Sequence, residues 1–205
     1  MRNNNHKIKS GKELKLPNAL ILIDYINDIV HPAGKFSAAS AMLHEKNTVA
    51  NCNKTLAYAR KNNWLILWVK VAFSANYPEV SANSPIFSTA KQLQALAKGS
   101  WGTELLADLD YQEPEIIIYK NRISPFYATN LELILRTQQI DTLYLAGVST
   151  DWAIEAAARD AHDRNFKVII LENLCASSSL ENHNQTLKVI SRIAKVVNSH
   201  SLEPN

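Results

Sequence analysis

Short apolar runs alternate with stretches of helical periodicity along the chain. Five apolar runs of strand length, two of them closed by a charged residue, predict buried strands at 18–24, 64–71, 115–120, 143–146 and 166–171. Apolar positions at helical spacing predict helices over 43–62, 89–97, 129–138, 152–164 and 180–193. Residues 193–197 are either a sixth short strand or the end of the last helix. Strands that alternate with helices indicate an α/β protein with a parallel sheet covered on both faces.

The length of the chain sets its domain organisation. A chain of 205 residues fits one domain with a full hydrophobic core. We expect a flexible N-terminal arm over residues 1–16, where the sequence is polar, a single domain over 17–199, and a C-terminal tail over 200–205. The long irregular stretch 73–87 inside the domain is typical of a functional loop.

Composition and charge exclude several classes of protein. Hydrophobic residues make up 46% and charged residues 20% of the chain, as in an ordinary globular protein, and the net charge is +3. The basic residues form no stripe with interleaved aromatic residues, so we expect no nucleic-acid partner. No apolar run approaches the ~20 residues that span a bilayer, and the polar N-terminus has no signal-peptide core. We therefore expect no membrane contact and a cytoplasmic location.

The two cysteines give no metal centre and no disulfide framework, because both need more thiols. Cys52 lies on the apolar stripe of the predicted helix 43–62 and is expected in the core. Cys175 follows the fifth predicted strand. We expect no cofactor and no metal ion, since His31 stands alone in its loop.

The stretch 143–161 combines a strand, a tight turn at Gly147 and a helix. In an open parallel sheet, ligands bind outside the carboxyl ends of the strands, where this turn lies. Three short polar residues precede the helix, and Thr150 or Asp151 would make a good N-cap. The first turn of the helix would also offer N–H groups and a positive dipole end to an anion.

Two charged residues close other predicted strands. Asp24 follows the first strand and Lys120 ends the third, so the sheet should bring both to one edge beside the turn after Gly147. Taken singly, the aspartate is a common turn residue and the lysine a common surface group. Together in a half-buried pocket, the carboxylate could move a proton while the lysine tunes its pKa.

Three segments show a resemblance to a known family. LILIDYINDIV, KNRISPFYATNLELIL and AGVSTDWAIEAAARDAHDRNFKVIILENLCASS resemble the isochorismatase-like hydrolase superfamily, also called cysteine hydrolases, from about residue 17 to residue 197. The resemblance implies a Rossmann-like three-layer sandwich, with a six-stranded parallel sheet and helices on both faces. It also implies that Asp24 and Lys120 are catalytic, and that the peptide bond between Val148 and Ser149 is cis.

The resemblance also exposes a departure at Ala153. In most of the family the nucleophilic cysteine stands at this position, but alanine cannot attack a substrate. In the amidase branches the N–H groups of Ser149 and Ala153 would form an oxyanion hole. Cys175 falls where the family has small structural residues, so we do not expect it to replace the missing nucleophile.

Three hypotheses for the function follow. The first is a hydrolase that uses no cysteine, in which Asp24 protonates a vinyl ether or assists another non-covalent hydrolysis and Lys120 tunes the acid. The second is a cysteine amidohydrolase for a small amide or ureide, with its nucleophile replaced by Ala153. The third is an inactive relative that binds a small molecule or a partner protein.

Other residues complete the expected site. We expect the aromatic side chains of Trp152, Phe36, Phe73 and Tyr77 to shape the pocket for a small-molecule substrate. Arg122 and Lys70 could bind a substrate carboxylate. His162 and His183 are expected on solvated helix faces, and a homo-oligomer (a dimer or larger) is expected from the resemblance.

Overall fold

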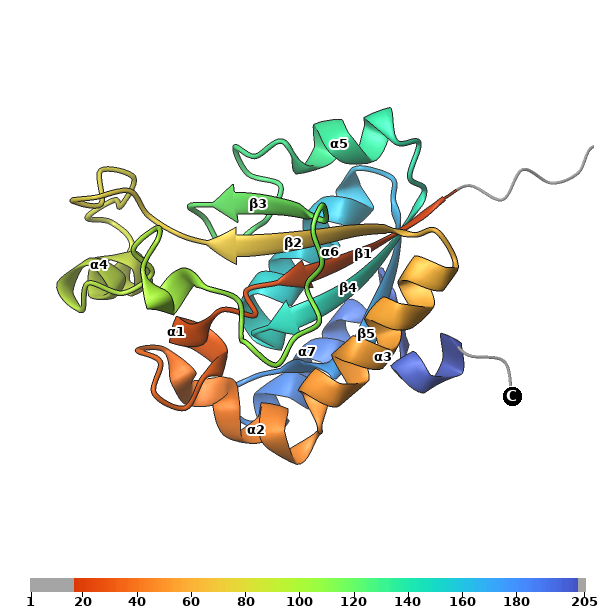
Figure 1. The fold of residues 1–205 in the computed structure, drawn as a ribbon, viewed down its shortest axis with the longest axis horizontal. Helices are drawn as coiled ribbons and strands as arrows, with labels where there is room; N and C mark the ends of the chain where they lie inside the picture. Colours follow the sequence, from red (N-terminus) through yellow and green to blue (C-terminus); the bar gives the residue numbers. More distant parts are fainter. Residues whose placement is uncertain (1–16, 203–205) are drawn as a thin grey trace, which may run out of the picture.

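The computed structural model describes residues 17–202 and shows six parallel strands in one sheet (Figure 1). The predicted arm 1–16 and the end of the tail, 203–205, lie outside the described residues. The strand order is β3-β2-β1-β4-β5-β6, as a Rossmann-like fold requires. The strands are β1 (Asn18–Ile23), β2 (Leu65–Val71), β3 (Ile116–Lys120), β4 (Thr142–Val148), β5 (Lys167–Ala176) and β6 (Lys195–Val197).

Helices cover both faces of this sheet, which confirms the predicted three-layer α/β architecture. The α-helices are α1 (Asn27–Val30), α2 (Ser40–Glu45), α3 (Thr48–Lys61), α4 (Pro85–Gln92), α5 (Leu131–Thr137), α6 (Glu155–Asp163) and α7 (Leu180–Ile190). One face carries α5, α6 and α7, and the other carries α2 and α3. None of the helices in 17–202 has the length and apolar character that crossing a bilayer demands.

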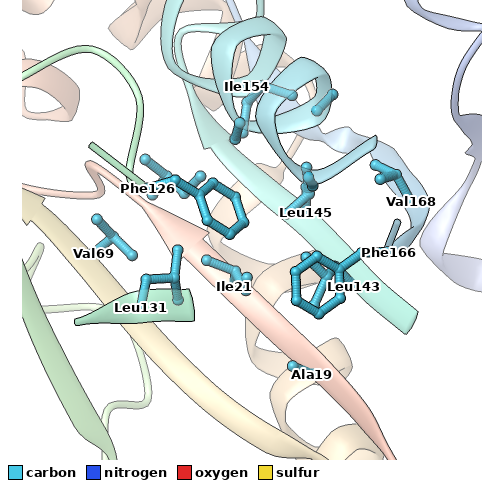
Figure 2. Packing of buried hydrophobic residues seen from close by; sticks show 14 of the residues in the cluster. Ala19, Ile21, Val69, Phe126, Leu131, Leu143, Leu145, Ile154, Phe166 and Val168 are labelled. Atoms are coloured by element: carbon cyan, nitrogen blue, oxygen red, sulfur yellow. The ribbon is translucent and has the colours of Figure 1, made fainter. Parts of the chain in front are cut away.

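The central strand β1 shows how the core forms on both faces. Its side chains alternate, so Ala19, Ile21 and Ile23 pack on one side of the sheet and Leu20 and Leu22 on the other. Figure 2 shows the first of these cores, where residues of β1 and β4 face apolar side chains from the covering helices and loops. Both faces of β1 are buried, which explains its continuous apolar sequence.

Three predicted elements differ from the structure. The predicted helix 43–62 is two helices, because Asn47 adopts a left-handed conformation with φ 49° between α2 and α3. The helix predicted at 89–97 is instead α4, whose start is fixed by Pro85 and by the Ser84 side chain that accepts from the Phe87 N–H. The fifth strand runs on to Ala176, past a register shift between β4 and β5.

The strand order reverses between β1 and β4, at the position where the sequence predicts the site. β1 and β4 are neighbours in the sheet although they are far apart in sequence, and ligands bind at such a switch point in related architectures. The carboxyl ends of the strands face α1 and α4 in Figure 1. Gly147, with φ 150°, permits the contact between these strands, because a Cβ there would lie 2.3 Å from the Ile23 carbonyl oxygen.

We predict that Gly147→Ala lowers the free energy of unfolding by more than about 2 kcal/mol, because both the positive φ and the contact with Ile23 disfavour a side chain. Gly99→Ala is the matched control. Gly99 also has a positive φ, but a Cβ there would meet no atom within 4 Å, so this variant should lose only about 1 kcal/mol. Urea denaturation measures both, and equal losses would contradict the proposed steric contact.

Candidate active site

A cavity of about 250 Å³ opens at the carboxyl end of the sheet. Its polar lining comes from the ends of β1 and β3, the turn after β4 and the segment after β5, while α4 and the segments before α2 and after α4 supply apolar side chains. The lining residues are Asp24, Ile29, Phe36, Ala38, Ala39, Val71, Ile86, Phe87, Leu96, Lys120, Ile123, Val148, Ser149, Asp151, Trp152, Ala153 and Ser178.

The predicted acid–base pair is assembled in this cavity. The Lys120 Nζ lies 2.7 Å from Asp24 Oδ2, and the two side chains are only 2% and 4% exposed. The other carboxylate oxygen, Oδ1, accepts from the Val71 N–H at 2.7 Å. Asp24 leaves β1 with φ 59°, a left-handed conformation that aspartate tolerates better than most residues. The chain turns there, and the carboxyl group lies at the ends of three strands.

The Lys120 ammonium is fully engaged by the protein. Besides Asp24, its Nζ donates to the carbonyl oxygens of Arg122 at 3.2 Å and Ile123 at 3.0 Å. An ammonium group has three donors, and these three acceptors match them. The lysine is therefore held in place by Asp24 and by the turn after β3.

Burial raises the pKa of the Asp24 carboxyl above its usual value, and this effect outweighs the Lys120 charge and the hydrogen bonds, which lower it. The reason is that a buried carboxylate loses its hydration, which disfavours the charged form. The sequence alone did not indicate which of the opposing effects would prevail. The direction found here increases the fraction of this carboxyl that is protonated at a given pH.

The turn after β4 lies beside this pair. The peptide bond between Val148 and Ser149 is cis, as the resemblance implied. The Ser149 N–H meets no hydrogen-bond acceptor within the described residues, and Ser149 lines the cavity. Ala153, in the π-helical turn Thr150–Ile154, also lines the cavity. Its side chain is a methyl group, at the position where the resemblance implies a nucleophilic cysteine in most of the family.

The predicted N-cap at this turn is wrong. Ser149 occupies the N-cap position and its side chain makes no capping hydrogen bond. Asp151 Oδ1 instead accepts from the Ser177 hydroxyl at 2.6 Å, and the Thr150 hydroxyl contacts His183. Both side chains therefore link the turn to β5 and α7 rather than to the first N–H groups of the helix.

Comparison with known proteins identifies the family of the chain. The family model described as "Isochorismatase domain" matches residues 18–201. The chain belongs to the isochorismatase family. The chain is 31% identical over 179 residues, covering 87% of it and 90% of the relative, to the uncharacterized isochorismatase family protein YecD of Escherichia coli O157:H7.

Two other relatives of this isochorismatase-family chain extend the comparison. It is 28% identical over 169 residues to the ureidoacrylate amidohydrolase RutB of Variovorax paradoxus (strain S110), covering 76% of the chain and 67% of that protein. The crystal structure of an isochorismatase-like hydrolase from Alkaliphilus metalliredigens superimposes with a TM-score of 0.76 and 27% identity, covering 90% of this chain and 96% of that one.

The structure divides the predicted aromatic residues of the family site into two groups. Phe36 and the half-exposed Trp152 line the cavity. Phe73 and Tyr77 do not: both are buried in a cluster with Phe87, and the Tyr77 hydroxyl donates to the Ala95 carbonyl at 2.9 Å. The structure does not place them in the cavity lining, because the segment after β2 packs them into its own small core.

The two cations proposed to bind a substrate carboxylate also lie outside the cavity lining. Lys70 Nζ lies 5.2 Å from the centre of the Tyr119 ring. Arg122 Nη1 donates to the carbonyl oxygens of Glu79 and Asn121. Sequence reasoning also missed the apolar lining from α4, since its residues fall in a long segment with no clear periodicity.

Thiols and metal ligands are not gathered at this edge. Cys52 and Cys175 are free and buried, as expected for Cys52, and burial raises the pKa of each thiol to about 12. Neither supplies a thiolate at neutral pH. Within residues 17–202, no group of three or more His, Cys, Asp or Glu side chains could hold a metal ion, and His31 packs its ring against Trp101.

His183 was predicted on a solvated face, but it is only 2% exposed, because α7 packs against the turn after β4. Its Nδ1 lies 2.7 Å from the Thr150 hydroxyl and its Nε2 lies 2.9 Å from Lys46 Nζ. Lys46 also donates to the Glu172 and Cys175 carbonyls, so its ammonium donates to Nε2 and the imidazole proton is on Nδ1. His162, as predicted, is exposed.

The pKa of His183 is lowered to about 4, first by burial and then by the Lys46 charge, with Glu172 and Asp151 acting in the opposite direction. The ordinary value is 6.5, so the folded chain binds fewer protons than the unfolded chain between these values. We predict that the contribution of this histidine to the free energy of unfolding is fully present above pH 6.5. It should be lost, by on the order of 3 kcal/mol, as the pH falls from 6.5 through 4.

Urea denaturation across this pH range measures the effect. His183→Gln should flatten the pH dependence of the free energy of unfolding, whereas His162→Gln should leave it unchanged, since that ring is exposed. An unaltered pH dependence in His183→Gln would contradict a buried neutral imidazole.

Proposed function

We propose that this chain is a hydrolase for a small molecule that works without a covalent intermediate, with Asp24 as the general acid. The observation that carries the proposal is the raised pKa of a carboxyl group that lines the cavity and lies 2.7 Å from Lys120. A carboxyl group whose pKa is raised by burial is protonated in a larger fraction of molecules at a given pH, and the protonated form can donate a proton to a substrate. Ala153 supplies no nucleophile, which favours direct attack by water.

Vinyl ether hydrolysis fits these groups. The Asp24 proton moves to the terminal carbon of the C=C bond, and the electron pair of that bond forms the new C–H bond. The resulting oxocarbenium ion takes up water, which gives a proton back to the Asp24 carboxylate, and the hemiacetal breaks down to an alcohol and a carbonyl compound. Lys120 and the Val71 N–H stabilise the carboxylate that remains, since each already bonds one of its oxygens.

We predict that the chain hydrolyses phenyl vinyl ether to phenol and acetaldehyde and that Asp24→Asn lowers kcat/KM by about 10²-fold or more, as loss of a general acid does. The rate of the unchanged chain should decrease as the pH rises through the pKa of Asp24, because only the protonated carboxyl is active. Phenol release, corrected for the uncatalysed reaction at each pH, measures both effects.

Circular dichroism must first show that Asp24→Asn is folded, because the pair is buried. Asp163→Asn is the matched control: this carboxylate is 79% exposed and lies at the far end of α6. Its activity should equal that of the unchanged chain. Full activity in Asp24→Asn would exclude the proposed acid.

A second candidate is amide hydrolysis, favoured by the relative named ureidoacrylate amidohydrolase and by Ser149, a residue of the cavity lining whose N–H meets no acceptor within the described residues. Here a thiol would stand at position 153, at the start of a helix and beside the acidic pair, where its thiolate is stabilised. On this hypothesis the alanine replaces the nucleophile of an amidohydrolase.

We predict that Ala153→Cys gives the chain activity on a small neutral amide such as nicotinamide, which the unchanged chain should not hydrolyse. Ammonia release measures the reaction, and Ala153→Ser is the control of similar size with a weaker nucleophile. No activity in Ala153→Cys would count against the amidohydrolase hypothesis. If the unchanged chain also leaves vinyl ethers intact, an inactive homologue that binds a small molecule or a partner protein is the remaining hypothesis.

The expected homo-oligomer and cytoplasmic location belong to the same proposal. Several large apolar side chains are exposed, including Tyr127, Leu133 and Leu180, each above 60%. Side chains of this kind are enriched in contacts between subunits. They support an assembly of a dimer or larger.

A further inference from the structure

We propose that the cavity binds an uncharged small molecule with an apolar body and excludes carboxylate anions. The inference rests on the proposed function only in taking this cavity as the substrate site, and it is independent of the reaction carried out there. It follows from where the cavity lining places its charges and from how the nearby cations are already paired.

The single cation in the described lining is not available to a ligand. Lys120 donates to Asp24, Arg122 and Ile123, which account for all three of its N–H donors. A substrate carboxylate could pair with this ammonium only by displacing one of these partners. Displacing Asp24 would leave a buried carboxyl without its partner, which is strongly unfavourable.

Nearby cations that could have approached the cavity are held elsewhere. Lys35 Nζ donates to the carbonyl oxygens of Leu93 and Gln94, each at 2.9 Å. Lys98 Nζ lies 4.4 Å from the centre of the Tyr119 ring, on which Lys70 also packs. The arginine of this region donates to main-chain carbonyls, as described above. These lysine and arginine side chains therefore already have partners within the protein.

The helix start at this edge also disfavours an anion. Asp151 stands in the first turn after Ser149 and lines the cavity, so the positive end of the helix already has a carboxylate of the protein beside it. Asp151 is held there by the Ser177 hydroxyl at 2.6 Å. A ligand carboxylate would meet this negative charge and an apolar wall without gaining an ion pair, and would lose its hydration.

The remaining polar groups suit a neutral ligand. The Ser149 N–H can donate to a carbonyl or ether oxygen, and the carboxyl groups of Asp24 and Asp151 can accept from an N–H or O–H. Apolar side chains such as Phe36 and Ile86 enclose the rest of the ligand. These contacts define the substrate class as a small amide, ether or alcohol without an anionic group.

Benzamide and benzoate test the inference, because they share size and shape and differ in charge at pH 7.5. Isothermal titration of the full chain should show benzamide binding at least tenfold more tightly than benzoate. Asp151→Asn should tighten benzoate binding severalfold, since it removes a negative charge from the lining. Asp163→Asn, a distant exposed carboxylate, should change neither affinity.

Ile86→Trp locates the binding site, because the larger side chain fills the cavity from α4 and should weaken benzamide binding. Benzoate binding as tight as benzamide would overturn the inference, and so would failure of benzamide to bind up to its solubility limit. Selective binding without vinyl ether hydrolysis would keep the inference and reject the proposed reaction. Vinyl ether hydrolysis without selectivity for benzamide over benzoate would support the proposed reaction and reject the inference.

Discussion

The buried ion pair between Asp24 and Lys120 is the interaction on which this edge of the molecule depends. The pair spans three strands: the carboxyl group follows β1, the ammonium ends β3, and between them the last residue of β2 donates its N–H to the same carboxyl. Removing one member of a buried pair typically costs 3–5 kcal/mol, because the other is left uncompensated. The strand ends are therefore held in register by the group proposed to perform the chemistry.

The apolar cavity gives this pair its chemical character. A carboxyl group exposed to water beside a lysine would be held ionised, but here desolvation outweighs the lysine and the pKa of Asp24 rises. The same desolvation acts on any ligand that enters. A neutral molecule loses little on leaving water, whereas an anion loses its hydration and finds each donor of Lys120 already engaged. On both proposals, the same desolvation raises the pKa of Asp24 and disfavours an anionic ligand.

The sequence predicts the parts of the site that depend on strand order and fails on those that depend on side-chain packing. Asp24 and Lys120 close apolar strands, and the ends of parallel strands share one edge, so their meeting is predictable. Phe73 and Tyr77 follow a strand in the same way, yet they pack into a separate core with Phe87. No periodicity in that long segment indicates which side chains face the cavity.

His183 shows the same limit of sequence reasoning, because it was predicted to be exposed and is buried. Its position on an amphipathic helix gives no sign that Lys46, far away in sequence, would meet its imidazole beneath the turn after β4. The break between α2 and α3 places this lysine next to β5, and a left-handed asparagine at a helix boundary is difficult to detect in a helical pattern. Long-range polar pairs of this kind become visible only once the fold has placed both partners.

The alanine at position 153 is consistent with a pair that is complete without a nucleophile. All donors of Lys120 and both oxygens of Asp24 have partners in the described residues, and none of these partners is residue 153. A thiol at this position would add a reactive atom to an arrangement that already has its hydrogen-bond partners and its counter-charge. With alanine, the same position contributes only a methyl group, and the space beside the Ser149 N–H is left to water and substrate. In the proposed mechanism the strand ends provide proton transfer, whereas nucleophilic attack by the protein would need a different side chain at position 153 on the following helix.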